Sequence, residues 1–371
     1  MADNAWGTRA HVGGAGGAAA AAALRGAGTI DEAALAPLRA SMARGRRRWA
    51  WLCAALLLII CGLVVAVLTI GNTLYSPALV WSVLSGAQVE GATYAIWEVR
   101  LPRLLAGLLV GFAFGVAGNT FQTMLRNPLA SPDVIGITSG ASTAAVFCIL
   151  VLDWGPSQAS PVAIAASLLL AAAIYGLSTI RGFSSGKLIL VGLGVQALTK
   201  ALTSYLLLKA AAYDVPAALR WLSGSLNGVA LGDVGLLVLV LPLAAAVVCL
   251  GRRLRVLELG DETATMLGVR PNVTRAALIV CSVVMIALGT AVTGPIACVT
   301  FLAGPIATRL VGQQGSASVP AGLVGVILVL AADVIGQNFL GTRFPVGVVT
   351  GILGTPYLLY LLVSMNRKGS M

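Results

Sequence analysis

Residues 49–70 read WAWLCAALLLIICGLVVAVLTI, a run without a charged side chain. An apolar helix of about 20 residues is long enough to cross the hydrocarbon core of a bilayer. Comparable runs recur as far as Leu362, and almost every charged residue lies between them. Only 10% of the chain is charged, against about 25% in ordinary soluble domains. We therefore predict an all-α integral membrane protein in which residues 49–365 form about ten transmembrane helices.

The first 48 residues differ in composition from the rest of the chain. They include HVGGAGGAAAAAALRGAG, an Ala/Gly run with too little apolar bulk to form a core. We predict that residues 1–48 are a largely disordered cytoplasmic tail, with a short helix over 31–43. A cleaved targeting peptide is not indicated, since no hydrophobic stretch followed by a small-residue cleavage site precedes Arg44.

The net charge of +11 would suggest nucleic acid as a partner in a soluble protein. Here the lysines and arginines cluster at one set of span ends, as the positive-inside rule describes for the cytoplasmic side. The opposite set of ends holds Arg100, Arg103, Lys209, Arg220 and Arg343. This asymmetry predicts a multi-pass plasma membrane protein with both termini in the cytoplasm, an even number of crossings and no nucleic-acid partner.

Two spans carry unusual patterns of glycine and proline. The second span, about 102–124, has Gly107, Gly111 and Gly115 at four-residue spacing, which lets two helix backbones approach closely. We expect this stripe to pack inside its own subunit, with a dimer face as the alternative. The eighth span, GPIACVTFLAGPIATRLVG, is short, and we expect Pro295, Gly304 and Pro305 to break it.

The chain offers little chemistry of its own. No acidic residue lies clearly inside a span, with Asp333 the nearest, and this counts against a proton- or sodium-coupled carrier. The six cysteines lack metal-ligand spacing, and the single histidine lies in the tail. We predict no catalytic residue, metal site or cofactor on this chain. Lys200, near the middle of the fifth span, is a candidate pathway residue or a snorkelling cation.

The longest loop on the positively charged side contains LELGDETATMLGVRP, residues 257–271. Acidic residues in a first turn favour a helix, and glycine and proline end one, so we predict a short helix from Asp261 to Leu267. A transporter without its own energy source would use such a helix to receive force from a soluble motor. A solvated connection with incidental helical propensity is the alternative.

Four blocks of the sequence resemble those of one family. The first is RLPRLLAGLLVGFAFGVAGNTFQTMLRNPLASPDVIGITSGAS, residues 100–142, and the others are LGDETATMLGVR, GPIACVTFLAGPIATRLVG and FPVGVVTGILGTPYLLYLL. Together they are similar to the FecCD (BtuC-like) permeases, the membrane subunits of ABC importers for iron-siderophores, haem and cobalamin. The blocks occur in the family's order over nearly the whole chain beyond the tail.

The resemblance implies a type II importer. It would comprise two permease subunits, identical or homologous, two ATPases that hold the ATP and Mg, and an external solute-binding protein. In this family the Gly-Asp-Glu-Thr-Ala loop docks on the ATPase. The implied contact residues are Gly260, Asp261, Glu262, Ala264, Leu267 and Gly268.

The resemblance also implies outer contacts and a path. Arg100 and Arg103 match arginines that pair with glutamates of the binding protein. A further docking arginine of the family aligns with Gln337, and we expect Arg343 to take its place. The implied gate and path residues are Ser184, Ser185, Gln196, Thr199 and Lys200.

The sequence thus predicts a permease that moves a ferric siderophore into the cytoplasm, driven by ATP hydrolysis on a partner chain. Cobalamin or haem as cargo remains an alternative within the family. An ion-coupled carrier or a channel is the alternative of another class.

Overall fold

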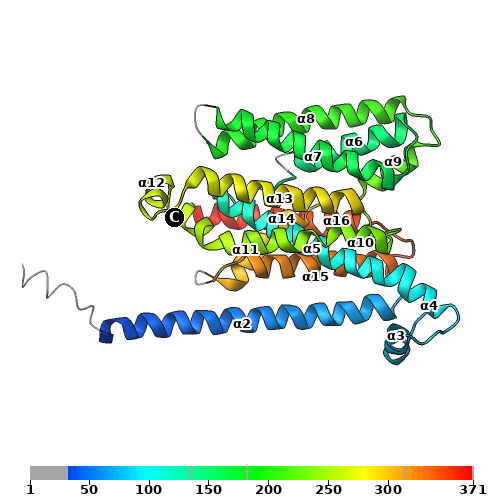
Figure 1. Cartoon of the computed structure of the whole chain (residues 1–371), viewed down its shortest axis with the longest axis horizontal. Coiled ribbons are helices and arrows are strands. Elements are labelled where there is room, and N and C mark those ends of the chain that lie inside the picture. Colours follow the sequence, from blue (N-terminus) through cyan, green and yellow to red (C-terminus); the bar gives the residue numbers. More distant parts are fainter. Residues whose placement is uncertain (1–31, 134–135, 181–182, 313–314, 370–371) are drawn as a thin grey trace, which may run out of the picture. The chain divides into compact units, whose positions relative to one another are not determined.

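The computed structural model describes residues 32–133, 136–180, 183–312 and 315–369 (Figure 1). The chain divides into two compact units, Met1–Trp49 and Ala50–Met371, and every predicted site residue belongs to the second. The expectation of disorder for residues 1–31 lies outside the described residues. From Glu32 onward the chain is helical, so the short helix expected over 31–43 is part of α2, a longer one.

All regular structure in the described residues is helical. The elements are α2 (Glu32–Thr69), α3 (Pro77–Leu84), α4 (Ala92–Tyr94), the π-helix η1 (Ala95–Arg100), α5 (Leu101–Met124), α6 (Ile137–Val151), α7 (Pro156–Thr179), α8 (Ser185–Lys209), α9 (Val215–Leu222), α10 (Leu231–Leu237), α11 (Val240–Leu257), α12 (Asp261–Met266), α13 (Pro271–Thr293), α14 (Val299–Val311), α15 (Ser318–Asn338) and α16 (Val346–Gly369).

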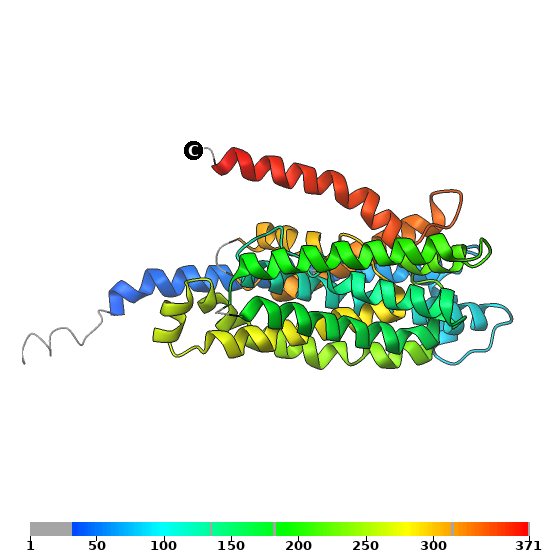
Figure 2. The same cartoon turned by 90° about the horizontal axis from the view of Figure 1, so that it is seen from above.

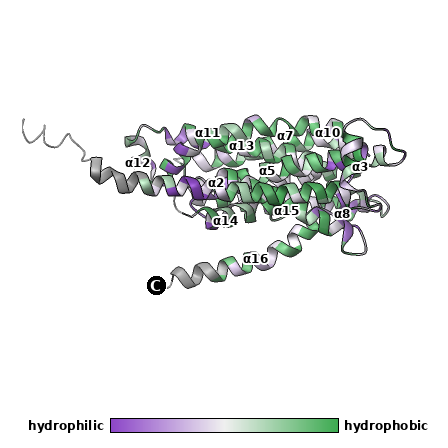
Figure 3. Ribbon diagram, turned by 90° about the horizontal axis from the view of Figure 1, so that it is seen from below, coloured by the Kyte–Doolittle hydropathy of each residue, from purple (hydrophilic) through white to green (hydrophobic). Residues whose placement is uncertain are grey.

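The helices account for about ten membrane-spanning segments, as predicted. Seven described helical segments are long and apolar enough to cross a membrane. Three shorter apolar segments, Ile137–Val151, Val299–Val311 and Val346–Leu361, occupy the places of the remaining predicted spans. Figure 3 shows hydrophobic residues along the lengths of the helices and hydrophilic ones gathered toward the helix ends, which is the distribution that a bilayer requires.

The most deeply buried helix is α5. It contacts α10, α11, α13, α14 and α15. A Cβ atom at Gly111 would lie 2.7 Å from Cα of Val326, and one at Gly115 would overlap the carbonyl of Ala321, both on α15. The glycine stripe therefore lets two backbones of the same subunit touch. This confirms the expectation of packing within the subunit.

The region of the eighth span is interrupted only at its beginning. Residues 294–298 separate α13 from α14, as Pro295 predicts. The expected break at Gly304 and Pro305 is wrong, because both lie inside α14. Proline removes the N–H that would bond the carbonyl of Phe301, and Gln122 Nε2 of α5 donates to that carbonyl instead at 2.9 Å. A side chain of α5 thus satisfies the group that the proline frees.

The remaining helices form less enclosed parts of the bundle. The helices α6, α7 and α8 contact one another, and α13 joins α6 and α7 to α5 (Figure 1). The helix α16 contacts α14 and α15, and its C-terminal part extends away from the other helices (Figure 2). Of the seven long spans, α8 is the least buried, so it is covered either by lipid or by another protein.

Candidate functional site

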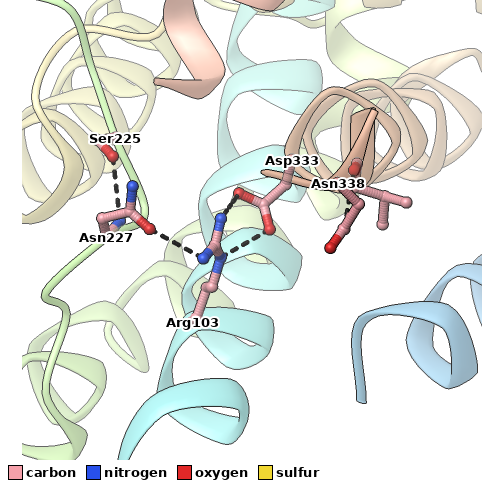
Figure 4. A network of polar contacts seen from close by, with 6 residues as sticks. Arg103, Ser225, Asn227, Asp333 and Asn338 are labelled. Atoms are coloured by element: carbon pink, nitrogen blue, oxygen red, sulfur yellow. Dashed lines mark hydrogen bonds and ion pairs between the residues drawn. The ribbon is translucent and has the colours of Figure 1, made fainter. Parts of the chain in front are cut away.

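Arg103 ties three elements together at the end of the bundle that the charge pattern assigns to the outside (Figure 4). From α5, its Nε donates to Asp333 Oδ2 of α15 at 2.7 Å, and its Nη2 forms an ion pair with Oδ1 of the same carboxylate. Its Nη1 donates to Asn227 Oδ1 at 2.8 Å. Because both charged side chains are largely buried, each compensates the desolvation of the other.

Arg100 is also engaged within the chain. It ends η1, a π-helical turn of a kind often found at functional sites. Its guanidinium donates to the carbonyls of Leu68 at 2.5 Å and Thr73 at 2.7 Å and lies 4.7 Å from the ring centroid of Tyr75. Arg100 therefore fixes the loop after α2 against the start of α5.

A cavity of about 290 Å³ lies between the side chains of Arg100 and Arg103 and the loop after α15. Arg100, Arg103 and Arg343 all line it. Arg343 is exposed and donates through Nη2 to Asn72 Oδ1 at 2.7 Å. The Nε2 atom of Gln337, also in the lining, is buried without a hydrogen-bond partner. The cavity is thus rich in donors, which suits an anionic group.

The middle of the bundle holds a carboxylate that sequence reasoning missed. Asp133, in the connection between α5 and α6, accepts a hydrogen bond from Thr300 Oγ1 of α14. Asp333 is buried in the outer part of α15, where sequence reasoning placed the nearest acidic residue, and Asp133 adds a second carboxylate on a connection between spans. Only the fold reveals this, because Asp133 precedes a short helix and is drawn into the bundle with its loop.

Some of the predicted path residues make hydrogen bonds inside the bundle, and others are exposed on its surface. Gln196 Nε2 donates to the carbonyl of Asp133 at 2.6 Å, and Thr199 Oγ1 donates to Ser139 Oγ of α6 at 2.8 Å. These two side chains therefore fasten α8 to α6. Lys200 is exposed on α8. Of the predicted gate residues, Ser184 caps the start of α8 and is exposed, and Ser185 is half-buried.

At the opposite end of the bundle, α12 forms the short helix predicted from the sequence, ending one residue earlier, at Met266. It is held by its buried Ala264 and presents the other residues to solvent. Apolar side chains are among those exposed: Met266 is 86% exposed and Leu267 60%. Exposed apolar groups on a polar, membrane-external element are typical of a protein interface.

The first residue of α12 is fixed from α13. Arg275 Nη1 donates to Asp261 Oδ2 at 2.7 Å, and Nη2 forms an ion pair with Oδ1. These hydrogen bonds hold the pKa of Asp261 below its usual value, so the carboxylate is charged at cytoplasmic pH. The carboxylate of Asp261 is thereby directed at α13, while Glu262 and Gly268 stay exposed.

Sequence reasoning treated Arg275 only as one of many cations on the positively charged side and did not single out Met266. Helical periodicity could have identified Met266, because it lies two residues after the buried Ala264 and therefore on the opposite, exposed face of α12. No sequence signal pairs Arg275 with Asp261, because that contact depends on how the loop folds back. In the part of the chain that the structure describes, no cluster of three or more His, Cys, Asp or Glu side chains is arranged to hold a metal.

A model of the FecCD transport family matches residues 56–364. The chain belongs to the FecCD transport family. Among this permease's relatives, the ferric enterobactin transport system permease protein FepG of Escherichia coli is 36% identical, over 80% of this chain and 91% of FepG. The achromobactin transport system permease protein CbrC of Dickeya dadantii is 39% identical, over 84% of this chain and 90% of CbrC. A cobalamin import permease, BtuC of Halobacterium salinarum, is 33% identical over 74% of each chain.

The fold of this FecCD permease also matches a solved structure. An inward-facing metal-chelate type ABC transporter aligns with a TM-score of 0.75 and 25% identity, covering 84% of this chain and 98% of the other. The fold is therefore that of an ABC importer permease, as the sequence predicted.

The Arg103–Asp333 ion pair yields a stability prediction. Asp333→Asn leaves a buried guanidinium without its counter-charge, and losing one partner of a buried pair costs about 3 to 5 kcal/mol. We expect the thermal unfolding temperature of the purified protein in detergent to fall clearly. The control is Asp153→Asn, at an exposed position where asparagine tolerates the positive φ of 53°. Equal stability of the two variants would contradict the structural role of the pair.

Proposed function

We propose that this chain is the permease subunit of an ATP-driven importer that moves a ferric siderophore across the plasma membrane into the cytoplasm. It performs no bond-making chemistry, and hydrolysis of Mg-ATP takes place on a separate ATPase subunit. The complete importer contains two permease subunits, two ATPases and an external solute-binding protein. Both chain termini lie in the cytoplasm in this proposal.

The observation that carries the proposal is the surface of α12. Met266 of α12 and Leu267 just after it are exposed, and they lie in the loop between α11 and α13, which we place outside the membrane. A partner protein is the covering that this position favours. For a permease of the ABC type, that partner is the ATPase. Gly260, Asp261, Glu262, Ala264 and Gly268 shape and orient the contact.

The cargo assignment follows the relatives. Their names specify ferric enterobactin, Fe(3+)-citrate and iron(3+)-hydroxamate, and one is a probable siderophore permease. The cobalamin permease is 33% identical, like the hydroxamate and probable siderophore permeases, but its match covers 74% of this chain against 81% and 84% for those two. These names support a ferric chelate as the cargo, with cobalamin as the second candidate.

The outer cavity supports docking of the binding protein. Three arginines give this surface a positive character, and complementary charge speeds association of protein partners. Because Arg100 and Arg103 are held by internal contacts, we assign the direct contact with a carboxylate of the binding protein to Arg343. Arg100 and Arg103 contribute charge and shape the cavity.

The exposed side of α8 supports a path at the contact with a second permease subunit. This helix is the least buried of the long spans, and it carries Lys200 on its exposed side. Gln196 and Thr199, on an adjoining side of the helix, bond to the connection before α6 and to α6 itself, and so fix the position of α8. Ser184 and Ser185 begin the helix at its cytoplasmic end, where we place the gate.

Uptake of radioactive iron tests the cargo. Cells that lack the gene, and the same cells complemented with it, are given a panel of ferric siderophores beside labelled cobalamin. We expect the uptake of one ferric siderophore to be lost on deletion and restored by the gene. Loss of cobalamin uptake alone would contradict the iron assignment and favour the alternative cargo, and unchanged uptake of every compound would contradict both.

Replacing the exposed apolar residues of α12 tests the ATPase contact. Leu267→Asp and Met266→Asp place a carboxylate in an interface that excludes water. Interface residues of this kind contribute about 2 kcal/mol or more when they are hot spots. We expect copurification of the ATPase with the permease to fall about tenfold or more, while membrane insertion is unchanged. Leu340→Asp, at an exposed leucine near the outer cavity, is the matched control and should copurify normally. Normal copurification of both α12 variants would contradict the assignment.

Charge reversal tests the docking surface. Arg343→Glu should slow association with the binding protein, and the effect should be larger at low salt than at high salt because exposed charges are screened. Arg220→Glu removes another exposed outer arginine that lies outside the cavity lining, and should change the association rate less. Equal rates for wild type and Arg343→Glu would contradict the role of Arg343.

A further inference from the structure

Arg275 is a buried cation at the cytoplasmic end of the bundle with two different contacts. Its side chain is 7% exposed. The edge of its guanidinium holds the carboxylate of Asp261 in α12. The face of the same group lies over the ring of Phe183, with Cζ 4.6 Å from the ring centroid. One side chain of α13 therefore touches both α12 and the residue just before Ser184, where α8 begins.

Only arginine suits this arrangement. A guanidinium is planar and can bind a carboxylate along its edge while it stacks on an aromatic ring through its face. The ring of Phe183 is in turn placed against Tyr175 of α7, with 6.4 Å between ring centroids. The contacts thus continue from α12 through the guanidinium to Phe183, just before α8, and to Tyr175 of α7.

The loop that carries α12 has a second anchor of a different kind. Arg126 Nη2, just after α5, donates at 2.6 Å to the carbonyl of Leu257 at the end of α11. This contact ties the beginning of the loop to the most tightly enclosed helix. Arg275 instead joins the loop to Phe183, just before α8, the least buried long span. The contact of Arg126 therefore holds the beginning of the loop to α5. A displacement of α12 would instead be passed through Arg275 toward α8, which is less constrained.

We propose that Arg275 is the positioning residue that transmits displacement of α12 to Phe183 and the start of α8. The inference rests on the proposed function, which makes α12 the ATPase contact and α8 a wall of the path. When the ATPase shifts α12, the carboxylate of Asp261 carries the guanidinium with it. The guanidinium then moves the ring of Phe183, and with it the start of α8.

The test asks whether the contact between Arg275 and Phe183 couples ATP hydrolysis to transport or only stabilises the fold. Wild-type permease is reconstituted in proteoliposomes with its ATPase and binding protein, and the amount of ferric chelate transported per ATP hydrolysed is measured. Phe183→Leu removes the ring but leaves the Asp261–Arg275 ion pair intact. We expect this ratio to fall about fivefold or more, with ATPase copurification unchanged, and Phe183→Tyr to restore it. Phe147→Leu, at a half-exposed phenylalanine of α6, is the matched control and should keep the wild-type ratio.

A double-mutant cycle completes the test. In an Arg275→Met background, where the link is already broken, Phe183→Leu should lower the ratio no further. Two results would overturn the inference while leaving the proposed function intact. One is that Phe183→Leu transports as much ferric chelate per ATP as the wild type. The other is that Phe183→Leu lowers this ratio equally in the wild-type and the Arg275→Met backgrounds. Absence of ATP-driven transport in the wild type itself would overturn both.

Discussion

The close approach of α5 to its neighbours is the constraint on which the other features depend. A side chain larger than hydrogen at Gly115 would collide with the backbone of α15, so that position keeps the two helices in contact. With α5 fixed there, its outer end brings Arg103 to Asp333, and its inner part brings Gln122 to the carbonyl that Pro305 leaves free. Arg126, just beyond its end, reaches the loop that carries α12. One helix thus sets the positions of both functional ends.

The two ends use charge in different ways. At the outer end Arg100 and Arg103 are held by internal contacts, and Arg343 alone among the three cavity arginines is exposed. At the end that carries α12, the internal ion pair leaves apolar side chains exposed, where we propose that the ATPase binds. This division is physically reasonable, because a transient partner is recruited well by long-range charge whereas a permanent subunit is held by apolar burial.

Much of the fold follows from sequence patterns that act locally. Long uncharged runs predicted the spans, and the acidic first turn with Gly268 and Pro271 predicted α12 nearly to the residue. The features that escaped prediction depend on contacts between distant segments. The Gln122 amide that accommodates Pro305, and the pairing of Arg275 with Asp261, arise only when helices are packed. Burial of Asp133 likewise results from its loop entering the bundle, which hydropathy along the chain does not reveal.

The energy source of transport is the property that most directly distinguishes an ABC permease from an ion-coupled carrier. The decisive measurement is accumulation of a ferric chelate by proteoliposomes that contain the permease, its ATPase and its binding protein, with ATP supplied on the ATPase side and ionophores present or absent. Accumulation that requires ATP hydrolysis and persists when ionophores abolish the proton and sodium gradients is expected. Accumulation without ATP that collapses with an ion gradient would contradict the assignment.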